Sequence, residues 1–176
     1  MTRMKPCEIE VGICQLNRAP AHFLSLCLLL ALLLFNAAQA GANEDVEDIL
    51  AQSIAPDGVV FEIVDDDESA LEGLLPQLRI AIERIRARFP GTDFAVVSHG
   101  REEFALQSKY QSEQQGIHKA VKSLVADDVP VYVCETHAGW YGVTAEDFPD
   151  YVNVAPSGPA QINIYLELGY QRVVIE

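Results

Sequence analysis

Residues 93–100 read DFAVVSHG, an apolar run that predicts a strand over Asp93–Ser98, followed directly by His99 and Gly100. On either side, apolar residues recur at three- and four-residue spacing, which is typical of amphipathic helices. Pro90-Gly91 ends the first helix, and the second leads into a strand over Val129–Val133. The two apolar stripes consist of Leu74, Leu75, Leu78, Ile82, Ile85 and Phe89, and of Ile117, Val121, Leu124 and Val125.

The same alternation continues towards both ends of the chain. Asn43 can cap a short helix that precedes a strand over Val59–Val64. On the C-terminal side, a brief strand over Tyr151–Val154 leads to a helix capped by Ser157, and a last strand covers Tyr170–Ile175. Five strands alternating with helices through short connections predict an α/β fold, a three-layer sandwich with a five-stranded parallel sheet.

Several local details can also be predicted. Pro76 should lie in the first turn of its helix, where its missing N–H is tolerated. Residues 135–142, ETHAGWYG, should form a loop after the third strand. Ile162, Leu166 and Leu168 should supply apolar contacts in the last helix, which Gly169 should end. His118 lies on the helix around residues 117–125, where we expect it at the surface.

The first forty residues have the features of a secretory signal. Arg18 precedes an apolar run of 13 residues, Phe23–Phe35, which is shorter than the roughly 20 residues needed to span a bilayer. Ala38-Gln39-Ala40 fits the small-x-small cleavage pattern. We therefore expect a signal peptide at 1–40, cleaved after Ala40, and a periplasmic domain at 41–176 with no stable membrane span. The long, partly acidic start is atypical, so another start codon or retention as an anchor stays open.

Composition and charge exclude some classes of partner. With 49% hydrophobic and 22% charged residues, the chain can form an ordinary packed core. Its formal net charge of -14 argues against binding nucleic acid or an anionic membrane, because both require a surplus of Lys and Arg. The sequence contains no P-loop, no G-x-G-x-x-G and no Ser-His-Asp signature, so no cofactor is predicted.

Cys134 is the leading candidate for a functional residue. Cys7, Cys14 and Cys27 leave with the predicted signal, so the mature domain keeps one cysteine. A solitary cysteine in an exported protein is a buried inert thiol, an intermolecular bridge or a reactive site. Its spacing to His137, C-x-x-H, also allows a metal pair, but two ligands are too few unless His99 completes the site.

Further candidates gather where the predicted strands end. In an open parallel sheet, ligands bind at the carboxyl ends of the strands. We expect Cys134 and His99 to carry the chemistry there, with His99 polarising the thiol or orienting a substrate. Backbone N–H groups at the helix start near Ser157 could hold an anion. The candidate substrate-binding residues are Gly100, Thr136, His137, Trp140, Ser157 and Gly158.

Four parts of the sequence form a recognisable set: AVVSHGREEFAL, IHKAVKSL followed by DVPVYVC, YGVTAEDF, and VNVAPSG followed by L-E-L-G-Y. Together they resemble the DsrE/DsrF-like family, which includes DsrE, TusD and YchN-like proteins. The resemblance covers half to two thirds of the mature domain. It implies a small parallel α/β sandwich that forms homotrimers or hexamers, with a persulfide carried at the position of Cys134. His99 matches the family's His-Gly. The best-known members are cytoplasmic, whereas this chain carries an export signal.

These observations lead to one leading expectation and two alternatives. The leading expectation is a periplasmic sulfur-handling protein in which Cys134 accepts and donates sulfane sulfur, exchanged with a sulfur-transfer protein or a small sulfur species. We expect a sulfur carrier that passes sulfur between partners rather than an enzyme that turns over a small substrate. The first alternative is a non-catalytic oligomeric binding module with a structural Cys134, and the second is a Cys/His metal-binding protein.

Overall fold

The computed structural model describes residues 40–176. The apolar run and the three cysteines of the predicted signal lie outside these residues, so the prediction of export stays a prediction. The described elements are α2 (Ala40–Leu50), β1 (Gly58–Ile63), α3 (Leu71–Arg88), β2 (Asp93–Ser98), η2 (Arg101–Leu106), η3 (Ser108–Tyr110), α4 (Gln115–Ala126), β3 (Val131–Cys134), α5 (Glu135–Trp140), η4 (Ala145–Asp147), β4 (Asn153–Ala155), α6 (Gly158–Glu167) and β5 (Tyr170–Ile175).

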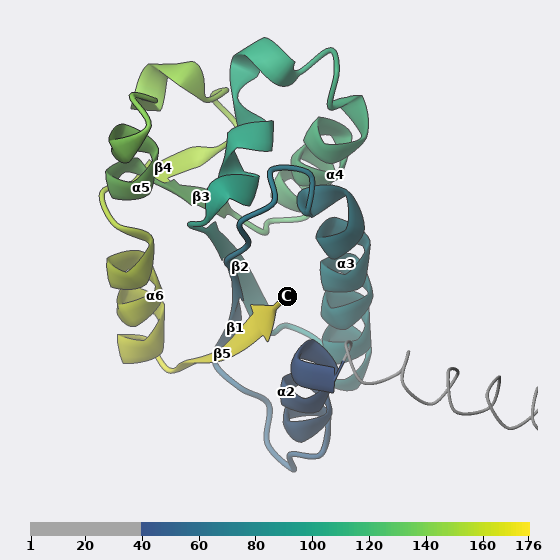
Figure 1. Cartoon of the computed structure of the whole chain (residues 1–176). Coiled ribbons are helices and arrows are strands. Elements are labelled where there is room, and N and C mark those ends of the chain that lie inside the picture. The colour runs from purple at the N-terminus through teal and green to yellow at the C-terminus, as the bar shows by residue number, and fades with distance from the viewer. Residues whose placement is uncertain (1–39) are drawn as a thin grey trace, which may run out of the picture. The chain divides into compact units, whose positions relative to one another are not determined.

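The five strands form one sheet in the order β4-β3-β2-β1-β5, and every pair is parallel. Helices α2, α3 and α4 cover one face, and α6 covers the other (Figure 1). This is the predicted α/β sandwich with a five-stranded parallel sheet. Among the described residues, no helix is long and apolar enough to cross a membrane.

The two faces of the sheet bury very different amounts of apolar surface. The larger cluster packs Leu78 and Ile82 of α3 against Phe61 and other strand residues, all almost fully buried. The smaller cluster contains Val60, Ala95, Val97 and a single helix residue, Ile162 of α6. Hydrophobic burial therefore stabilises mainly the α3–α4 side, and the α6 side is thinly covered.

Two expectations about helix ends are wrong. α3 begins at Leu71, so Pro76 lies in its second turn rather than its first. α2 includes Asn43, which therefore does not cap it. At the other end of the chain, the predicted caps are present: the Ser157 hydroxyl accepts the Ala160 N–H of α6 at 3.4 Å, and Gly169 has a φ of +88° where that helix ends.

The segment after β3 is a short helix rather than a loop. Residues Glu135–Trp140 form α5, whose N-cap is Cys134, and Gly142 with a φ of +71° lies in the turn that follows. The Cys134 sulfur accepts the N–H of His137 at 3.4 Å. This side-chain cap satisfies a backbone donor at the helix start, which explains why the chain turns helical immediately after the strand.

His118 lies in the core and not at the surface, with 2% of its area exposed. Its Nε2–H donates to the Ala105 carbonyl at 3.1 Å, so its Nδ1 accepts the hydroxyl of Tyr151. Burial lowers the pKa of His118 below its ordinary value. A neutral imidazole with both nitrogens satisfied can thus be buried, and it links η2 to the segment before β4.

α6 buries only part of its apolar surface. Ile162 faces the sheet, but the helix exposes Ile164 (50%), Leu166 (41%) and the following Leu168 (62%). The expected contacts of Leu166 and Leu168 are therefore wrong within this chain. The physical reason is that, among residues 40–176, α6 is the helix that packs on this face of the sheet, and no other described helix covers its outer side.

Candidate functional site

The strand register brings Cys134 and His99 together. In the pairing of β2 with β3, Ser98 lies opposite Val133, so the next residues along the two strands are His99 and Cys134. Neighbouring strands are about 4.8 Å apart. Side chains alternate along a strand, and Tyr132 contacts Tyr165 of α6, so Cys134 points to the same face as α6. The carboxyl ends of β2 and β3 therefore form the centre of the candidate site.

Cys134 is buried among polar groups, with 4% of its area exposed. Its N–H donates to Oε2 of Glu103 at 2.8 Å, and its sulfur accepts the N–H of His137. The carboxylate that holds this strand end comes from η2, which follows β2. The thiol is thus placed by two segments that are about 30 residues apart in sequence.

Glu103 and His137 form a hydrogen-bonded pair next to the thiol. Oε1 of Glu103 lies 2.8 Å from Nδ1 of His137, and the glutamate is fully buried. Burial raises the pKa of Glu103 to about 7, against the lowering effects of the Cys134 N–H and of His137, and Glu102 adds to the rise. A carboxyl group that titrates near neutral pH beside an imidazole is typical of sites that move protons.

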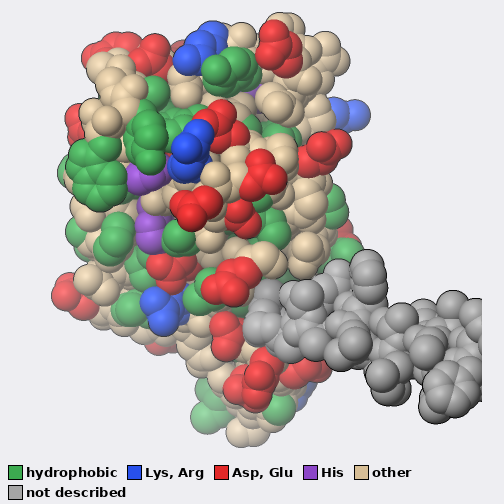
Figure 2. All heavy atoms as spheres, viewed as in Figure 1, with side chains coloured by type: hydrophobic (Ala, Val, Ile, Leu, Met, Phe, Trp, Pro, Cys, Tyr) green, Lys and Arg blue, Asp and Glu red, His purple; other side chains and the backbone are tan. Residues whose placement is uncertain are grey.

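Aromatic rings surround His137 on several sides. Phe104 stacks on the imidazole with a centroid separation of 5.5 Å and an angle of 12°. Tyr141 lies 5.3 Å away, and Trp140, which is 75% exposed, meets the imidazole edge-on at 5.6 Å. Figure 2 shows histidine side chains reaching the surface near α5 and α6, beside hydrophobic side chains. The imidazole is therefore held in one orientation at the edge of the protein.

His99 makes its hydrogen bond away from the thiol. Its Nε2 lies 2.8 Å from Oε1 of Glu62, and Oε2 of the same carboxylate accepts Nη1 of Arg172 at 3.0 Å. The start of α6 packs against this histidine, since a Cβ on Gly158 would lie 2.5 Å from the Cβ of His99. His99 thus links β2 to β1, β5 and α6, and Gly158 permits that close approach.

Gly100 and Glu102 shape the turn after β2. The Glu102 carboxylate is fully buried and accepts three hydrogen bonds, from the Ser98 hydroxyl (2.6 Å), the Gly100 N–H (3.1 Å) and the Asp65 N–H (2.8 Å). A Cβ on Gly100 would lie 2.6 Å from both the backbone N and the backbone O of Asp65. Gly100 is therefore needed for close packing against the β1–α3 connection.

The remaining predicted site residues hold the connections around Cys134. Thr136 donates its hydroxyl to the carbonyl of Pro156 at 2.6 Å, which ties α5 to the β4–α6 connection. The Ser157 hydroxyl accepts the Ala160 N–H as the N-cap of α6. The N–H that reaches the sulfur is that of His137, not one near Ser157. The structure thus brings all eight predicted residues to one sheet edge, with His137 in direct contact with the thiol through its backbone.

The sequence interpretation missed Glu102, Glu103 and Phe104. All three lie in the stretch REEFAL directly after His99-Gly100, and all three are almost fully buried. One signal could have indicated them: two adjacent carboxylates lie between a strand end and an apolar FAL segment. Charged residues are rarely buried without partners, so such a pair at a sheet edge suggests a built polar site.

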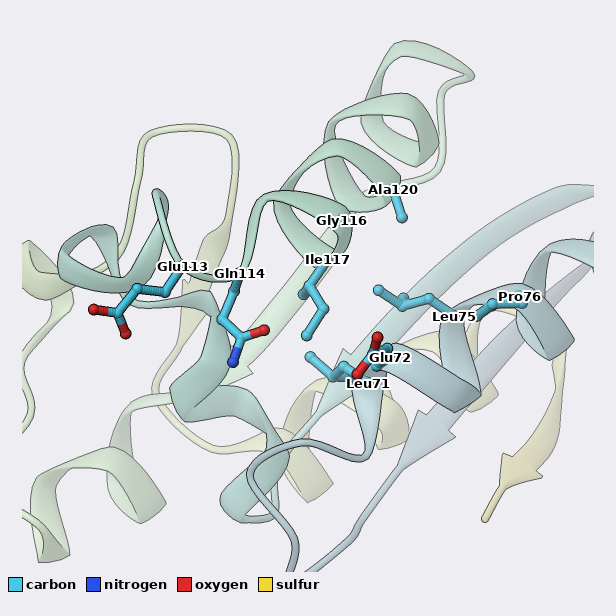
Figure 3. A pocket seen from close by; sticks show the side chains of 9 residues that line it. All are labelled: Leu71, Glu72, Leu75, Pro76, Glu113, Gln114, Gly116, Ile117 and Ala120. Carbon is cyan, nitrogen blue, oxygen red and sulfur yellow. The ribbon is translucent and has the colours of Figure 1, made fainter.

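A metal centre and an apolar cavity are two other kinds of site to compare with the Cys134 site. Among residues 40–176, no group of three or more His, Cys, Asp or Glu side chains is arranged to hold a metal ion, so the metal alternative has no support there. A cavity of about 300 Å³ lies between α3 and α4, lined by Leu71, Leu75 and Ile117 with Glu72 at its side (Figure 3). None of its lining residues belongs to the Cys134 site.

The fold and site define an α/β protein with a thiol and a His–Glu pair at the carboxyl edge of its sheet. No family model and no curated protein matches this chain. It is similar in structure to a protein of unknown function from Methanobacterium thermoautotrophicum, with a TM-score of 0.53 and 22% identity over 66% of this chain and 96% of that one. A conserved protein of unknown function from Bacteroides thetaiotaomicron gives a TM-score of 0.48 and 12% identity, covering 68% and 95%. The first likeness shows a shared fold.

Proposed function

We propose that this protein is an exported sulfur carrier of the DsrE/DsrF-like type, in which Cys134 accepts and donates sulfane sulfur. The observation that carries the proposal is the hydrogen bond from the His137 N–H to the Cys134 sulfur at the end of β3. A backbone N–H stabilises negative charge on the atom that accepts it, so the same contact suits a thiolate or a persulfide. The proposed periplasmic location follows from the predicted signal at 1–40.

The proposed loading step needs no added oxidant. The Cys134 thiolate attacks a sulfane sulfur of a polysulfide, and an S–S bond forms between them. The S–S bond within the polysulfide breaks, and its electron pair leaves with the shortened polysulfide. Because Cys134 is only 4% exposed, small sulfur species suit this step better than a bulky donor, and a protein partner would require local opening.

Exposure of the purified mature domain to polysulfide is expected to add the mass of one sulfur atom to Cys134. The reason is that this thiol is the only one in residues 41–176 and lies beside a donor N–H. Intact-protein and peptide mass spectrometry measure the adduct, and Cys134→Ala should give none. Absence of the adduct, or iodoacetamide labelling of Cys134 only after unfolding, would contradict the carrier role and favour a structural cysteine.

A second candidate function is a non-catalytic oligomeric binding module. The apolar residues that α6 exposes, Ile164, Leu166 and Leu168, favour it, because apolar side chains clustered at a surface mark interaction sites. Trp140 and Tyr141 are also exposed, at 75% and 53%. The family resemblance implies a homotrimer or hexamer, and this surface is the one that we propose for that assembly.

Ile164→Glu is expected to reduce the oligomer to smaller species, because a carboxylate in an apolar interface is costly to desolvate. Sedimentation velocity measures the change. The matched control is Ile80→Glu, which makes the same replacement at a 57% exposed isoleucine on α3, in the layer across the sheet. An unchanged sedimentation coefficient in Ile164→Glu, or an equal change in both variants, would show that α6 is not the contact surface.

A further inference from the structure

We propose that Glu103 is the positioning residue of this site. It holds His137 with its proton on Nδ1, so that Nε2 is the proton acceptor for the thiol that takes sulfur from Cys134. The inference rests on the proposed function, since it names the second substrate of that site as a small thiol. It also assigns roles to two residues, one of which, Glu103, sequence reasoning had not singled out.

Each carboxylate oxygen of Glu103 has a hydrogen-bond partner within the site. Oε2 accepts the Cys134 N–H and Oε1 faces Nδ1 of His137, each at 2.8 Å, and the side chain has no solvent contact. An ionised carboxylate can only accept hydrogen bonds. Nδ1 must therefore donate, and a neutral imidazole that carries its proton on Nδ1 leaves Nε2 with a free lone pair.

The imidazole ring cannot easily turn away from this arrangement. Phe104 stacks on one face, and Tyr141 and Trp140 lie against the ring at 5.3 and 5.6 Å. The hydrogen bonds made within residues 40–176 include none to Nε2 of His137. The side chain is 14% exposed, so Nε2 is the ring nitrogen available to a molecule arriving at the α5 surface.

The transfer step balances with these groups alone. Nε2 takes the proton of an incoming thiol, and the resulting thiolate attacks the outer sulfur of the Cys134 persulfide. A new S–S bond forms on the acceptor, and the bond between that sulfur and Cys134 breaks with its electron pair going to Cys134. The proton on His137 then passes to the released Cys134 thiolate. General base catalysis of this kind contributes roughly 10²-fold or more to rate.

Protonation of the pair should switch the base off. The groups that face Glu103 are His137, Cys134 and Glu102. Tyr141 lies next to His137, and the guanidinium of Arg101 lies over the Tyr141 ring at 5.6 Å. Burial raises the pKa of Glu103 to about 7. As the pH falls through this value, the pair formed by Glu103 and His137 gains a proton. Nε2 of His137 can then no longer accept the proton of an incoming thiol. Sulfur transfer to a small thiol should therefore rise with pH through about 7 and level off above it.

Glu103→Gln tests the inference because its amide can adopt only one useful orientation. The Cys134 N–H requires the amide oxygen, so the amide NH₂ faces Nδ1 of His137 and makes it an acceptor. The imidazole proton then moves to Nε2, which loses its role as a base; a wrong tautomer of this kind is highly damaging in catalytic triads. We expect the rate of sulfur transfer from the Cys134 persulfide to dithiothreitol to fall roughly 10²-fold. The rise of this rate with pH through about 7 should also disappear.

The tautomer itself can be measured without any sulfur chemistry. In ¹⁵N-histidine NMR spectra at about pH 8, the wild-type protein should carry the His137 proton on Nδ1, and Glu103→Gln should carry it on Nε2. The matched control, Glu135→Gln, removes an equal charge from an exposed residue adjacent to Cys134 and should leave the tautomer and pH profile unchanged.

Each outcome separates this inference from the proposed function. A wild-type proton on Nε2 overturns the inference, and that spectrum does not depend on whether any variant folds. An unaltered rate and pH profile in Glu103→Gln overturns it as well. If polysulfide adds no sulfur to Cys134 but the tautomers are as expected, the carrier proposal fails while the positioning role of Glu103 remains.

Discussion

Glu102→Ala is expected to lower the free energy of unfolding by on the order of 4 kcal/mol. The carboxylate has no solvent contact and satisfies three donors, the Ser98 hydroxyl and the N–H groups of Gly100 and Asp65. Removing it leaves all three donors without an acceptor, two of them in the buried residues Ser98 and Gly100 and one in the partly buried Asp65. Each buried unsatisfied donor costs about 1–3 kcal/mol. Urea denaturation followed by circular dichroism measures the loss.

Two further variants calibrate that result. Glu102→Gln keeps an oxygen for Ser98 and Gly100 but turns an NH₂ group towards the Asp65 N–H, so an intermediate loss is expected. Glu83→Ala removes an exposed carboxylate from α3 and should change stability by no more than about 0.5 kcal/mol. A loss in Glu102→Ala as small as that of Glu83→Ala would mean that the three donors find other acceptors.

Gly100→Ala is expected to destabilise the protein by on the order of 3 kcal/mol, although it adds one methyl group. Its Cβ would lie 2.6 Å from the backbone N and O of Asp65 and would also contact the carboxylate of Glu102. Backbone atoms cannot rotate aside as a flexible side chain can, so the β1–α3 connection must shift. Backbone strain is not involved, because φ at Gly100 is -108°.

Gly73→Ala is the matched control for the glycine prediction. Gly73 lies in α3, and a Cβ there would have nothing within 4 Å. Alanine favours a helix over glycine, so this variant should gain about 0.5–1 kcal/mol. Thermal and urea unfolding should therefore move in opposite directions for the two glycine variants. Equal small effects would show that the turn after β2 can relax around a methyl group.

Both large effects fall on the segment that carries the site. Glu102 and Gly100 hold the turn between β2 and η2, and the next residue of η2, Glu103, binds the Cys134 N–H. Variants of neighbouring groups in one hydrogen-bond network are not additive, so Gly100→Ala in a Glu102→Ala background should cost less than it does alone. The stability of this turn and the geometry of the thiol are therefore coupled.

Local signals made much of the fold predictable. The strands Asp93–Ser98 and Tyr170–Ile175 occur with the predicted bounds, and the Ser157 cap and the Gly169 helix end are present. These features depend on a few consecutive residues whose backbone preferences are expressed wherever the segment lies. The alternation of strands and helices then permitted one class of architecture, because short connections between parallel strands must pass through helices.

The candidate site was predictable only in part, because its polar groups come from separate segments. The position of Cys134 and His99 at strand ends followed from the strand assignment. The contacts of Glu103 with the Cys134 N–H and with His137 could not be predicted, since the burial of a carboxylate depends on donors from other segments of the chain. His118 is a similar case, as its partners Ala105 and Tyr151 are distant in sequence.

Taken alone, the order of residues established the α/β class and the parallel sheet, because periodicity and turn residues act over short distances. Folding in three dimensions added the strand order β4-β3-β2-β1-β5, the exposed side of α6 and the pairing of Glu103 with His137. The physical reason is that the burial of a side chain and its hydrogen-bond partners depend on segments that are distant in the sequence. These segments meet only when β2, β3 and η2 pack together.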